Sequence, residues 1–414
     1  MRQVLILGAD GFIGRHLAFG LRANGWSVTA QARNPDRLAA MGFQTLRADL
    51  TDPATHSAAF WAPHLPSGVA LVNAAGLLTG TEPDFRAVHR DAPAAALQAL
   101  RGPALLISAV GTGADTPFAR WRRETEALFS GHCILRPGLV LGETSYGGSS
   151  LLRALAAMPV RLPVVGDGSQ PFNPIHAADL AEVVAECLET GLPGLWEIGG
   201  PEVITQTELA AGYRRWLGLS PVPPLHLPTP AAMTLGRLGD VLRIGPVSAT
   251  AVAQLQAGVL ARPEPLLARL KTRPRPVSVF LDARPAGTQD LWHARLYLLK
   301  PLIRLSLAAL WFASGLLGLA SPSSSFTPGL ALPEPIAVAL ARGFGALDLA
   351  LALALLRNWR PRPVALAQIA LVLAYTAGLT LLAPALWLDP YGGLLKNLPI
   401  LALLLTHLAL VEER

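Results

Sequence analysis

The chain begins with a short apolar segment that leads directly into three evenly spaced glycines. Residues 4–7 are all apolar and predict a buried parallel strand, and residues 16–24 predict an amphipathic helix. Gly8, Gly11 and Gly14 follow the strand at the spacing G-x-x-G-x-x-G. They allow, in turn, a tight bend, the approach of a pyrophosphate to the backbone, and close packing of the helix on the strand. Because the first turn of a helix also presents unpaired amides to a phosphate, this beginning predicts a dinucleotide-binding α/β fold with a doubly wound parallel sheet.

Further strand patterns alternate with helical patterns after this start. They lie at residues 27–32, 44–48, 69–72, 105–108 and 133–135. Arg33 comes at the end of the second strand, where dinucleotide-binding folds meet the adenosine ribose. An acidic residue there would bind the ribose 2′-hydroxyl, whereas an arginine favours a 2′-phosphate. Arg33 therefore favours NADP(H) over NAD(H), although it would also fit an arginine in a solvated loop.

Five short motifs resemble those of the short-chain dehydrogenase/reductase superfamily, in particular its extended and atypical members, which are similar to NAD-dependent epimerases and dehydratases. The motifs are Gly8-x-x-Gly11-x-x-Gly14, Asp49-Leu50, Asn73-Ala74-Ala75-Gly76, Ile107-Ser108-Ala109 and Leu135-Arg136-Pro137-Gly138. Within this superfamily, the chain most resembles the group that is related to the nucleotide-binding accessory subunit of respiratory complex I. The resemblance implies that Asp49 contacts the adenine ring and that Ser108 lies beside the nicotinamide. The cofactor-binding residues expected from the glycines and this resemblance are Gly8, Gly11, Phe12, Ile13, Gly14, Arg33, Asp49, Leu50, Asn73, Ala74, Ala75, Gly76, Ser108, Arg122 and Pro137.

The catalytic pair of that superfamily is altered in this chain. Its members use Tyr-x-x-x-Lys, in which the lysine lowers the pKa of a tyrosine that exchanges a proton with a carbonyl oxygen. The equivalent residues here are Phe118 and Arg122. Phenylalanine has no proton to give, whereas arginine keeps its charge and could still bind the ribose hydroxyls. No catalytic residue is assigned, Ser108 and Arg122 remain candidates, and the sequence leaves open whether the chain is an enzyme.

Long apolar stretches set the last third of the chain apart from the rest. They lie at about residues 301–320, 335–356, 364–388 and 391–411 and predict a bundle of four transmembrane helices. We therefore divide the chain into a nucleotide-binding domain at residues 1–290, with a small substrate-pocket part from about residue 150, and a membrane domain at 291–414. Arginines gather at residues 357–362, whereas the loop at 321–334 has no lysine or arginine. The positive-inside rule then predicts an inner-membrane protein whose nucleotide-binding domain and C-terminus are cytoplasmic.

The membrane domain resembles the DoxX-like family of four-helix membrane proteins. The resemblance is carried by Asp348 and by the residues at 387–393 and 395–399, which read Trp-Leu-Asp-Pro-Tyr-Gly-Gly and Leu-Lys-Asn-Leu-Pro. The wider family is linked to quinone-coupled oxidation of small sulfur compounds, which implies a quinone only by analogy. Charged groups within spans usually face the interior of a bundle. They could bind an anionic or quinone-like ligand or form a structural ion network; the predicted polar cluster is Arg342, Asp348, Asp389, Lys396 and Asn397.

Composition limits the remaining choices. Two cysteines, Cys133 and Cys187, do not suggest a disulfide framework or a metal site, and the net charge of +6 is too scattered to suggest nucleic-acid binding. The expected partners are a nicotinamide dinucleotide, the lipid bilayer, and a quinone or an apolar substrate. The main interpretation is a membrane-anchored oxidoreductase that acts on a membrane-associated acceptor or an apolar substrate. The alternatives are a catalytically degenerate nucleotide-binding module with a regulatory or assembly role, and a lipid- or isoprenoid-modifying reductase or isomerase.

Overall fold

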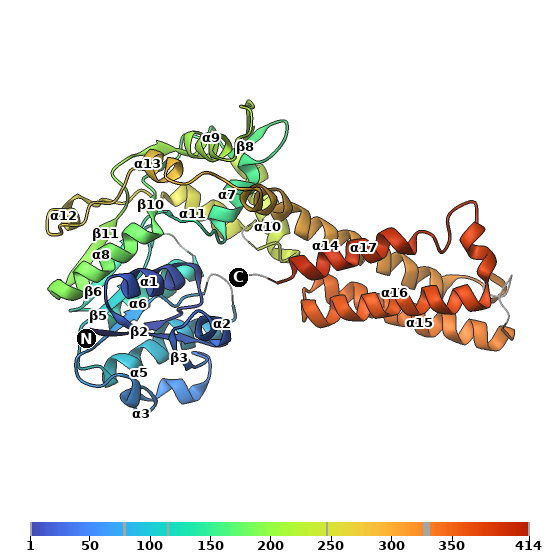
Figure 1. Ribbon diagram of the computed structural model, residues 1–414, viewed down its shortest axis with the longest axis horizontal. Helices are drawn as coiled ribbons and strands as arrows, with labels where there is room; N and C mark the ends of the chain where they lie inside the picture. Colours follow the sequence, from blue (N-terminus) through green and yellow to red (C-terminus); the bar gives the residue numbers. More distant parts are fainter. Residues whose placement is uncertain (1, 78–79, 114–115, 246, 326–331, 413–414) are drawn as a thin grey trace. The chain divides into compact units, whose positions relative to one another are not determined.

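The chain divides into two compact units (Figure 1). This computed structural model describes residues 2–77, 80–113, 116–245, 247–325 and 332–412. The first unit, here called the sheet unit, comprises Met1–Gly236 and Ser248–Ala294. The second, here called the bundle unit, comprises Arg237–Val247 and Arg295–Arg414.

A seven-stranded, entirely parallel sheet forms the centre of the sheet unit. Its strands are β1 (Gln3–Leu7), β2 (Ser27–Ala32), β3 (Gln44–Arg47), β4 (Val69–Asn73), β5 (Ala104–Ile107), β6 (Cys133–Pro137) and β11 (Gly194–Ile198). Their order is β11-β6-β5-β4-β1-β2-β3, so the direction of winding reverses between β1 and β4. The predicted doubly wound parallel sheet is confirmed. Ligands of such sheets bind beyond the carboxyl ends of the strands at this point of reversal.

The first strand is apolar throughout because both of its faces are buried. Val4 and Ile6 point into a core shared with α1 (Phe12–Ala23) and α8 (Ala177–Thr190). Leu5 and Leu7 point into the opposite core, which includes α5 (Ala92–Ala99). Helices therefore cover both faces of the sheet, which is the arrangement that a parallel sheet requires.

Shorter elements complete the sheet unit. Those near the main sheet are α2 (Asp36–Ala40), α3 (Ala58–Trp61), α4 (Glu82–Arg86), a π-helix at Ala87–Asp91, α6 (Pro117–Leu128), and 3₁₀ turns at Pro53–His56 and Ala62–His64. The rest are α7 (Gly148–Ala156), α9 (Gln206–Trp216), α11 (Ala249–Ala257), α12 (Glu264–Leu267), α13 (Val277–Asp282) and three strand pairs: β7 (Val140–Leu141) with β10 (Ile175–His176), β8 (Leu162–Val165) with β13 (Pro224–Leu227), and β9 (Pro171–Phe172) with β12 (Ile204–Thr205). Leu209, Tyr213 and Phe280 lie in the core of this second part. Helix α10 (Thr229–Val241) runs from the sheet unit into the bundle unit.

Among the described residues, three helices are long and apolar enough to cross a membrane, and from Arg295 onward they belong to the bundle unit. They are α14 (Thr288–Ala320), α15 (Glu334–Leu356) and α16 (Pro361–Leu382). A fourth apolar helix, α17 (Asn397–Leu410), has 14 residues. The third helix ends at Leu382, earlier than we expected, because Pro384 opens a 3₁₀ turn (Pro384–Leu388) and the helix does not resume until Asn397.

Candidate functional site

The glycine turn has the shape of a phosphate cradle. Gly8 has a φ of +71°, and a Cβ added there would lie 2.8 Å from the Cα of Ala75. A Cβ on Gly14 would lie 2.1 Å from the carbonyl oxygen of Gly8, so only glycine lets α1 pack this closely on the turn. Gly11 is the N-cap of α1 and has no side chain to occupy the first-turn amides. This end of α1 therefore keeps the open space and the donors that a pyrophosphate needs.

Gln31 anchors the turn from the neighbouring strand and was not anticipated from the sequence. Its side chain is 2% exposed. Its Oε1 accepts a hydrogen bond from the Gly8 amide at 2.8 Å, and its Nε2 donates to the carbonyl of Ala48 at 2.7 Å. One amide side chain thus ties β1, β2 and the segment after β3 together. The sequence signal that could have indicated this role is that Gln31 is a polar residue between the apolar positions of a buried strand.

Arg33, Asp49 and Leu50 follow the carboxyl ends of β2 and β3. Arg33 is exposed at the end of β2. Asp49 accepts hydrogen bonds from the amide and the hydroxyl of Thr51, whereas Leu50 is buried. The structure therefore places Arg33 and Asp49 at the edge of the sheet where the adenosine half of a dinucleotide would lie.

The segment after β4 carries an unsatisfied buried donor. Asn73 is fully buried, and its Oδ1 accepts a hydrogen bond from the amide of Ala75 at 3.1 Å. Its Nδ2 has no hydrogen-bond partner among the described residues. A buried donor of this kind calls for an acceptor. Together with the first-turn amides of α1, which no side chain caps, it fits a dinucleotide along the segment from Asn73 to Gly76.

His89 supports the same segment from the π-helix. Its Nε2 accepts a hydrogen bond from the amide of Leu77 at 3.1 Å, and its Nδ1 lies 3.2 Å from the hydroxyl of Thr125. Burial, and then the charge of Arg122, lower the pKa of His89 to about 3, although the bond to Leu77 acts in the opposite direction. His89 is therefore neutral at physiological pH, as its acceptor role requires. Sequence analysis missed it, because nothing in its neighbours marks it.

Arg122 lies at the carboxyl ends of β4 and β5. Its Nη1 donates to the carbonyl of Ile107 at 2.9 Å and approaches that of Ala75 at 3.4 Å. Its guanidinium stands 5.3 Å from the ring centre of Phe118, which is 7% exposed. Burial lowers the pKa of Arg122 to about 10, against the raising effect of Glu126, so the side chain stays charged at neutral pH. The structure thus places a fixed positive charge beside Phe118, a residue that has no hydroxyl group.

Ser108 is held by a buried carboxylate that the sequence did not single out. Its hydroxyl donates to Oε1 of Glu126 at 2.6 Å. Arg136 binds both oxygens of Glu126, at 2.8 and 2.6 Å, and this hydrogen bonding raises the pKa of Arg136. Glu126 lies one turn after Arg122 on α6, so both face the same edge of the sheet. The hydroxyl proton of Ser108 is therefore already engaged.

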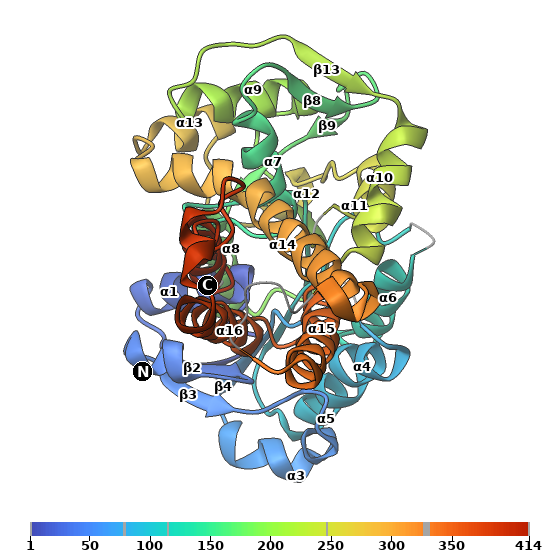
Figure 2. The ribbon, with the colours of Figure 1, turned by 90° about the vertical axis from the view of Figure 1, so that its right-hand side faces the viewer.

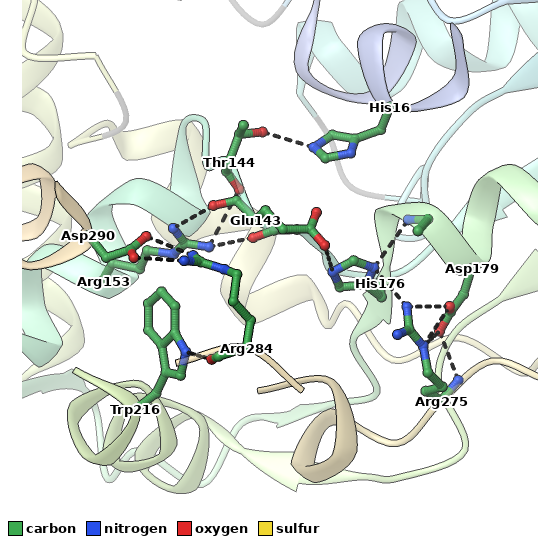
Figure 3. Close-up of polar contacts among 12 residues, drawn as sticks. His16, Glu143, Thr144, Arg153, His176, Asp179, Trp216, Arg275, Arg284 and Asp290 are labelled. Carbon is green, nitrogen blue, oxygen red and sulfur yellow. Dashed lines mark hydrogen bonds and ion pairs between the residues drawn. The ribbon is translucent and has the colours of Figure 1, made fainter. Parts of the chain in front are cut away.

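A second polar group, here called the histidine cluster, extends from α1 to the start of α8 (Figure 3). Nε2 of His16 lies 2.8 Å from the hydroxyl of Thr144, and Nε2 of His176 lies 3.4 Å from Oε1 of Glu143. Arg275 approaches the other ring nitrogen of His176 at 3.2 Å and pairs with Asp179 at 2.7 Å. The cluster consists of His16, Glu143, Thr144, His176, Asp179 and Arg275.

The charges in the histidine cluster act on one another. Burial lowers the pKa of His16 and of His176. Burial of Glu143 acts to raise the pKa of its carboxyl, but a backbone hydrogen bond and the charges of His176, His16 and Arg284 outweigh it, and the pKa falls. Asp179 also binds the backbone amide of Arg275 at 2.8 Å, and His176 caps α8 by accepting from the amide of Ala178. His176 and Asp179 thus both make structural contacts at the start of α8, and His176 also faces the carboxylate of Glu143.

The five polar residues predicted in the membrane domain have different surroundings. Asp348, 3% exposed, accepts hydrogen bonds from the hydroxyls of Ser314 at 2.6 Å and Tyr375 at 3.0 Å. Asn397 donates to Thr376, the residue next to Tyr375, at 2.9 Å, so α16 connects Asp348 with Asn397.

The other three predicted residues bind locally. Arg342 donates to the carbonyls of Gly318, Leu319 and Ser321 at the end of α14. Asp389 accepts from the amide of Gly393 at 3.0 Å. Lys396 lines a shallow surface hollow together with Tyr391. Across the described residues of the chain, no group of three or more metal-ligating side chains occurs.

Comparison with known proteins finds both a family match and a named relative. Residues 308–405 match the DoxX-like family, which confirms the resemblance predicted for the C-terminal region. A protein named ceramide reductase, from Caulobacter vibrioides (strain NA1000 / CB15N), is 27% identical over 253 residues, which are 57% of this chain and 77% of that protein.

Two solved structures resemble this chain in fold. UDP-glucose 4-epimerase of Thermus thermophilus in complex with NAD has a TM-score of 0.48 and 19% identity, covering 71% of this chain and 97% of its own. UDP-glucuronic acid 4-epimerase of Bacillus cereus in complex with NAD has a TM-score of 0.46 and 18% identity, covering 55% of this chain and 87% of its own. The chain combines a doubly wound parallel sheet with a region that matches the DoxX-like family.

Proposed function

We propose that this chain is a membrane-bound, NAD(P)H-dependent reductase that acts on a ketone of a long-chain lipid amide. The observation that carries the proposal is the likeness over 253 residues to a protein named ceramide reductase. Two features of the chain support it. The turn at Gly8 and the donor of Asn73 fit a dinucleotide, and the apolar helices keep the chain in a bilayer, where such a lipid dissolves.

The chemistry limits the reducible group. Bound NAD(P)H supplies a hydride to a carbonyl carbon; the carbonyl oxygen gains a proton, and the products are NAD(P)⁺ and an alcohol. Resonance makes the amide carbonyl of a ceramide a poor hydride acceptor, so the group reduced is a ketone in place of a backbone hydroxyl. Arg33 favours NADPH as the donor.

The residues at the sheet edge have separate roles in this proposal. Arg122 binds the ribose hydroxyls of the cofactor, and its charge stabilises the negative charge that develops on the substrate oxygen. Ser108 donates its hydroxyl hydrogen to Glu126, so it offers lone pairs rather than a proton to the reacting group. Because Phe118 has no proton, we propose that the alcohol oxygen takes its proton from solvent.

The placement in the membrane belongs to the same proposal. We infer an inner-membrane protein with a nucleotide-binding domain at residues 1–290 and a membrane domain at 291–414. The arginines at residues 357–362 follow α15 and support a cytoplasmic location for that turn and for the C-terminus. The nucleotide-binding domain then lies where NADPH is available.

The experiment uses the full chain in lipid nanodiscs. A ceramide with one backbone hydroxyl oxidised to a ketone is added with NADPH or NADH, and a short soluble ketone is the matched substrate. We expect NADPH absorbance to fall and the lipid to gain two hydrogens by mass, with little turnover of the soluble ketone. The variant Arg122→Gln should lose most of this rate, whereas Arg101→Gln, an exposed arginine in the same unit, should keep it. Tight NADPH binding without lipid reduction would refute the proposal.

The replacement of the catalytic pair favours a second candidate, a nucleotide-binding module without catalysis. Phe118 is buried against Arg122, so the usual proton donor is absent from its place. In this case bound NADPH would raise the unfolding temperature of the chain without being oxidised by a ketone or by a quinone. Oxidation by a soluble quinone alone would instead support electron transfer to a membrane acceptor, with Asp348 and Tyr375 as the groups to test.

A further inference from the structure

Helix α10 exposes an apolar stripe along one side. Leu235, Leu238 and Val241 are spaced three residues apart, which places them on one helix face. Their side chains are 50, 53 and 77% exposed. Single exposed apolar residues are common, but three in a row on one helix form a surface that water does not favour.

The opposite side of α10 packs on the chain that follows it. A Cβ on Gly236 would lie 2.7 Å from the amide nitrogen of Ala249, and one on Gly239 would lie 1.9 Å from the carbonyl oxygen of Val247. Figure 2 shows α10 beside α11. The two glycines thus fix which face of α10 is turned inward, and the apolar stripe is left on the outward face.

The end of α10 is bound to α14 near the start of its apolar stretch, at about residue 301, and to the end of α15. Arg304 of α14, 6% exposed, donates to the carbonyls of Leu242 and Arg243. Arg243 has a φ of +52° and donates through Nη1 to the carbonyl of Arg357 at 2.8 Å. Arg357 caps the end of α15, just before α16. All of these residues belong to the bundle unit.

These contacts fix the depth of the helix. The ends of membrane-spanning helices lie at the boundary between lipid and water, so a segment bonded to them lies at that boundary too. Apolar side chains at this depth enter the upper acyl region, and arginines beside them reach the headgroups. Arg237 lies between the first two members of the stripe, and Arg243 follows the third. Both attract anionic headgroups.

We propose that α10 is an interfacial membrane helix that inserts Leu235, Leu238 and Val241 into the boundary region of the bilayer. The end of α10 is bonded to helices that expose apolar side chains of their own, such as Leu302 at 57%, so we take the occupant of the stripe to be lipid. This inference does not depend on which reaction the sheet unit performs.

The test measures what surrounds the stripe. Val241→Cys and Leu238→Cys are labelled with an environment-sensitive fluorophore in the full chain; Cys133 and Cys187 are buried, so the label goes to the introduced thiol. The matched control is Val160→Cys in the sheet unit, where valine is 71% exposed. The protein is placed in vesicles of equal parts phosphatidylcholine and phosphatidylglycerol. One nitroxide quencher is attached high on the acyl chain and a second is dissolved in water.

We expect the label at residue 241 or 238 to be quenched several-fold more by the lipid nitroxide than by the aqueous one. The label at residue 160 gives the ratio of lipid to aqueous quenching for a position exposed to water. An aqueous-dominated ratio at residues 241 and 238, equal to that at 160, would overturn the proposal. A disulfide between two copies at residue 241, with neither quencher effective, would also overturn it, because a second chain would then cover the stripe.

Discussion

His89, which is neutral and accepts a hydrogen bond from the backbone amide of Leu77, makes the stability of the folded chain sensitive to acid. The pKa of His89 falls from 6.5 to about 3 because the ring is buried and faces Arg122. Between these values the unfolded chain holds a proton that the folded chain does not, so the free energy of unfolding falls as the pH falls. Above about pH 6.5 His89 is mostly neutral in the folded and the unfolded chain, and its effect on stability is small. Lowering the pH from 7.5 to 5.5 removes about 1.4 kcal/mol from the free energy of unfolding.

The measurement compares the natural chain with His89→Gln. Glutamine can still accept the Leu77 amide through its Oε1 but does not titrate. We expect urea unfolding in detergent, followed by tryptophan fluorescence, to show a loss between pH 7.5 and 5.5 that is about 1.4 kcal/mol smaller in the variant. His16 and His176 also have pKa values lowered by burial, but they are present in both chains and cancel. Equal losses in the two chains would refute the reasoning.

Three further substitutions test other parts of the site. Arg33→Asp should weaken NADPH binding by about tenfold and leave NADH binding unchanged, because it removes a charge-assisted bond to the 2′-phosphate. Nicotinamide fluorescence gives both affinities, and an equal loss of affinity for the two cofactors would contradict this prediction. Phe118→Tyr should raise ketone reduction by less than about tenfold, because Arg122 does not act as the lysine does; a gain in the range of about 100-fold expected from a general acid would contradict this. Asp348→Leu should lower bundle stability by about 1–3 kcal/mol by stranding two hydroxyls, and Asp348→Asn by less; thermal unfolding in detergent measures both, and equal effects would argue against the bonds described.

Most of the architecture followed from local patterns. The residues from Val4 to Leu7 could be recognised as a strand because their two faces enter two different cores. The bend at Gly8 and the contact at Gly14 could be predicted because each depends on the absence of a side chain, which the sequence states directly. The long apolar helices were visible for the same reason, since a bilayer imposes a length and a composition.

The supporting residues could not be predicted, because their partners are distant in sequence. Gln31 binds across two neighbouring strands, and His89 binds a backbone amide twelve residues earlier. The i+4 spacing of Arg122 and Glu126 on one helix was a usable signal, but the bond from Glu126 to Ser108 joins residues 18 positions apart. In the membrane domain, hydropathy showed which polar residues lie in spans, but not that Arg342 turns to the carbonyls at the end of α14.

The altered catalytic pair is best understood together with these supporting residues. If Arg122 were a relic of a lost lysine, its burial would leave an expensive charge with no function. Instead the fold compensates it: Ile107 accepts its hydrogen bond, Glu126 faces it, and His89 stays neutral beside it. These contacts hold the charge at the ends of two central strands, where it is positioned to bind a ligand. Binding the ribose is a use that both the catalytic and the non-catalytic proposals share, so only the fate of the nicotinamide hydride separates them.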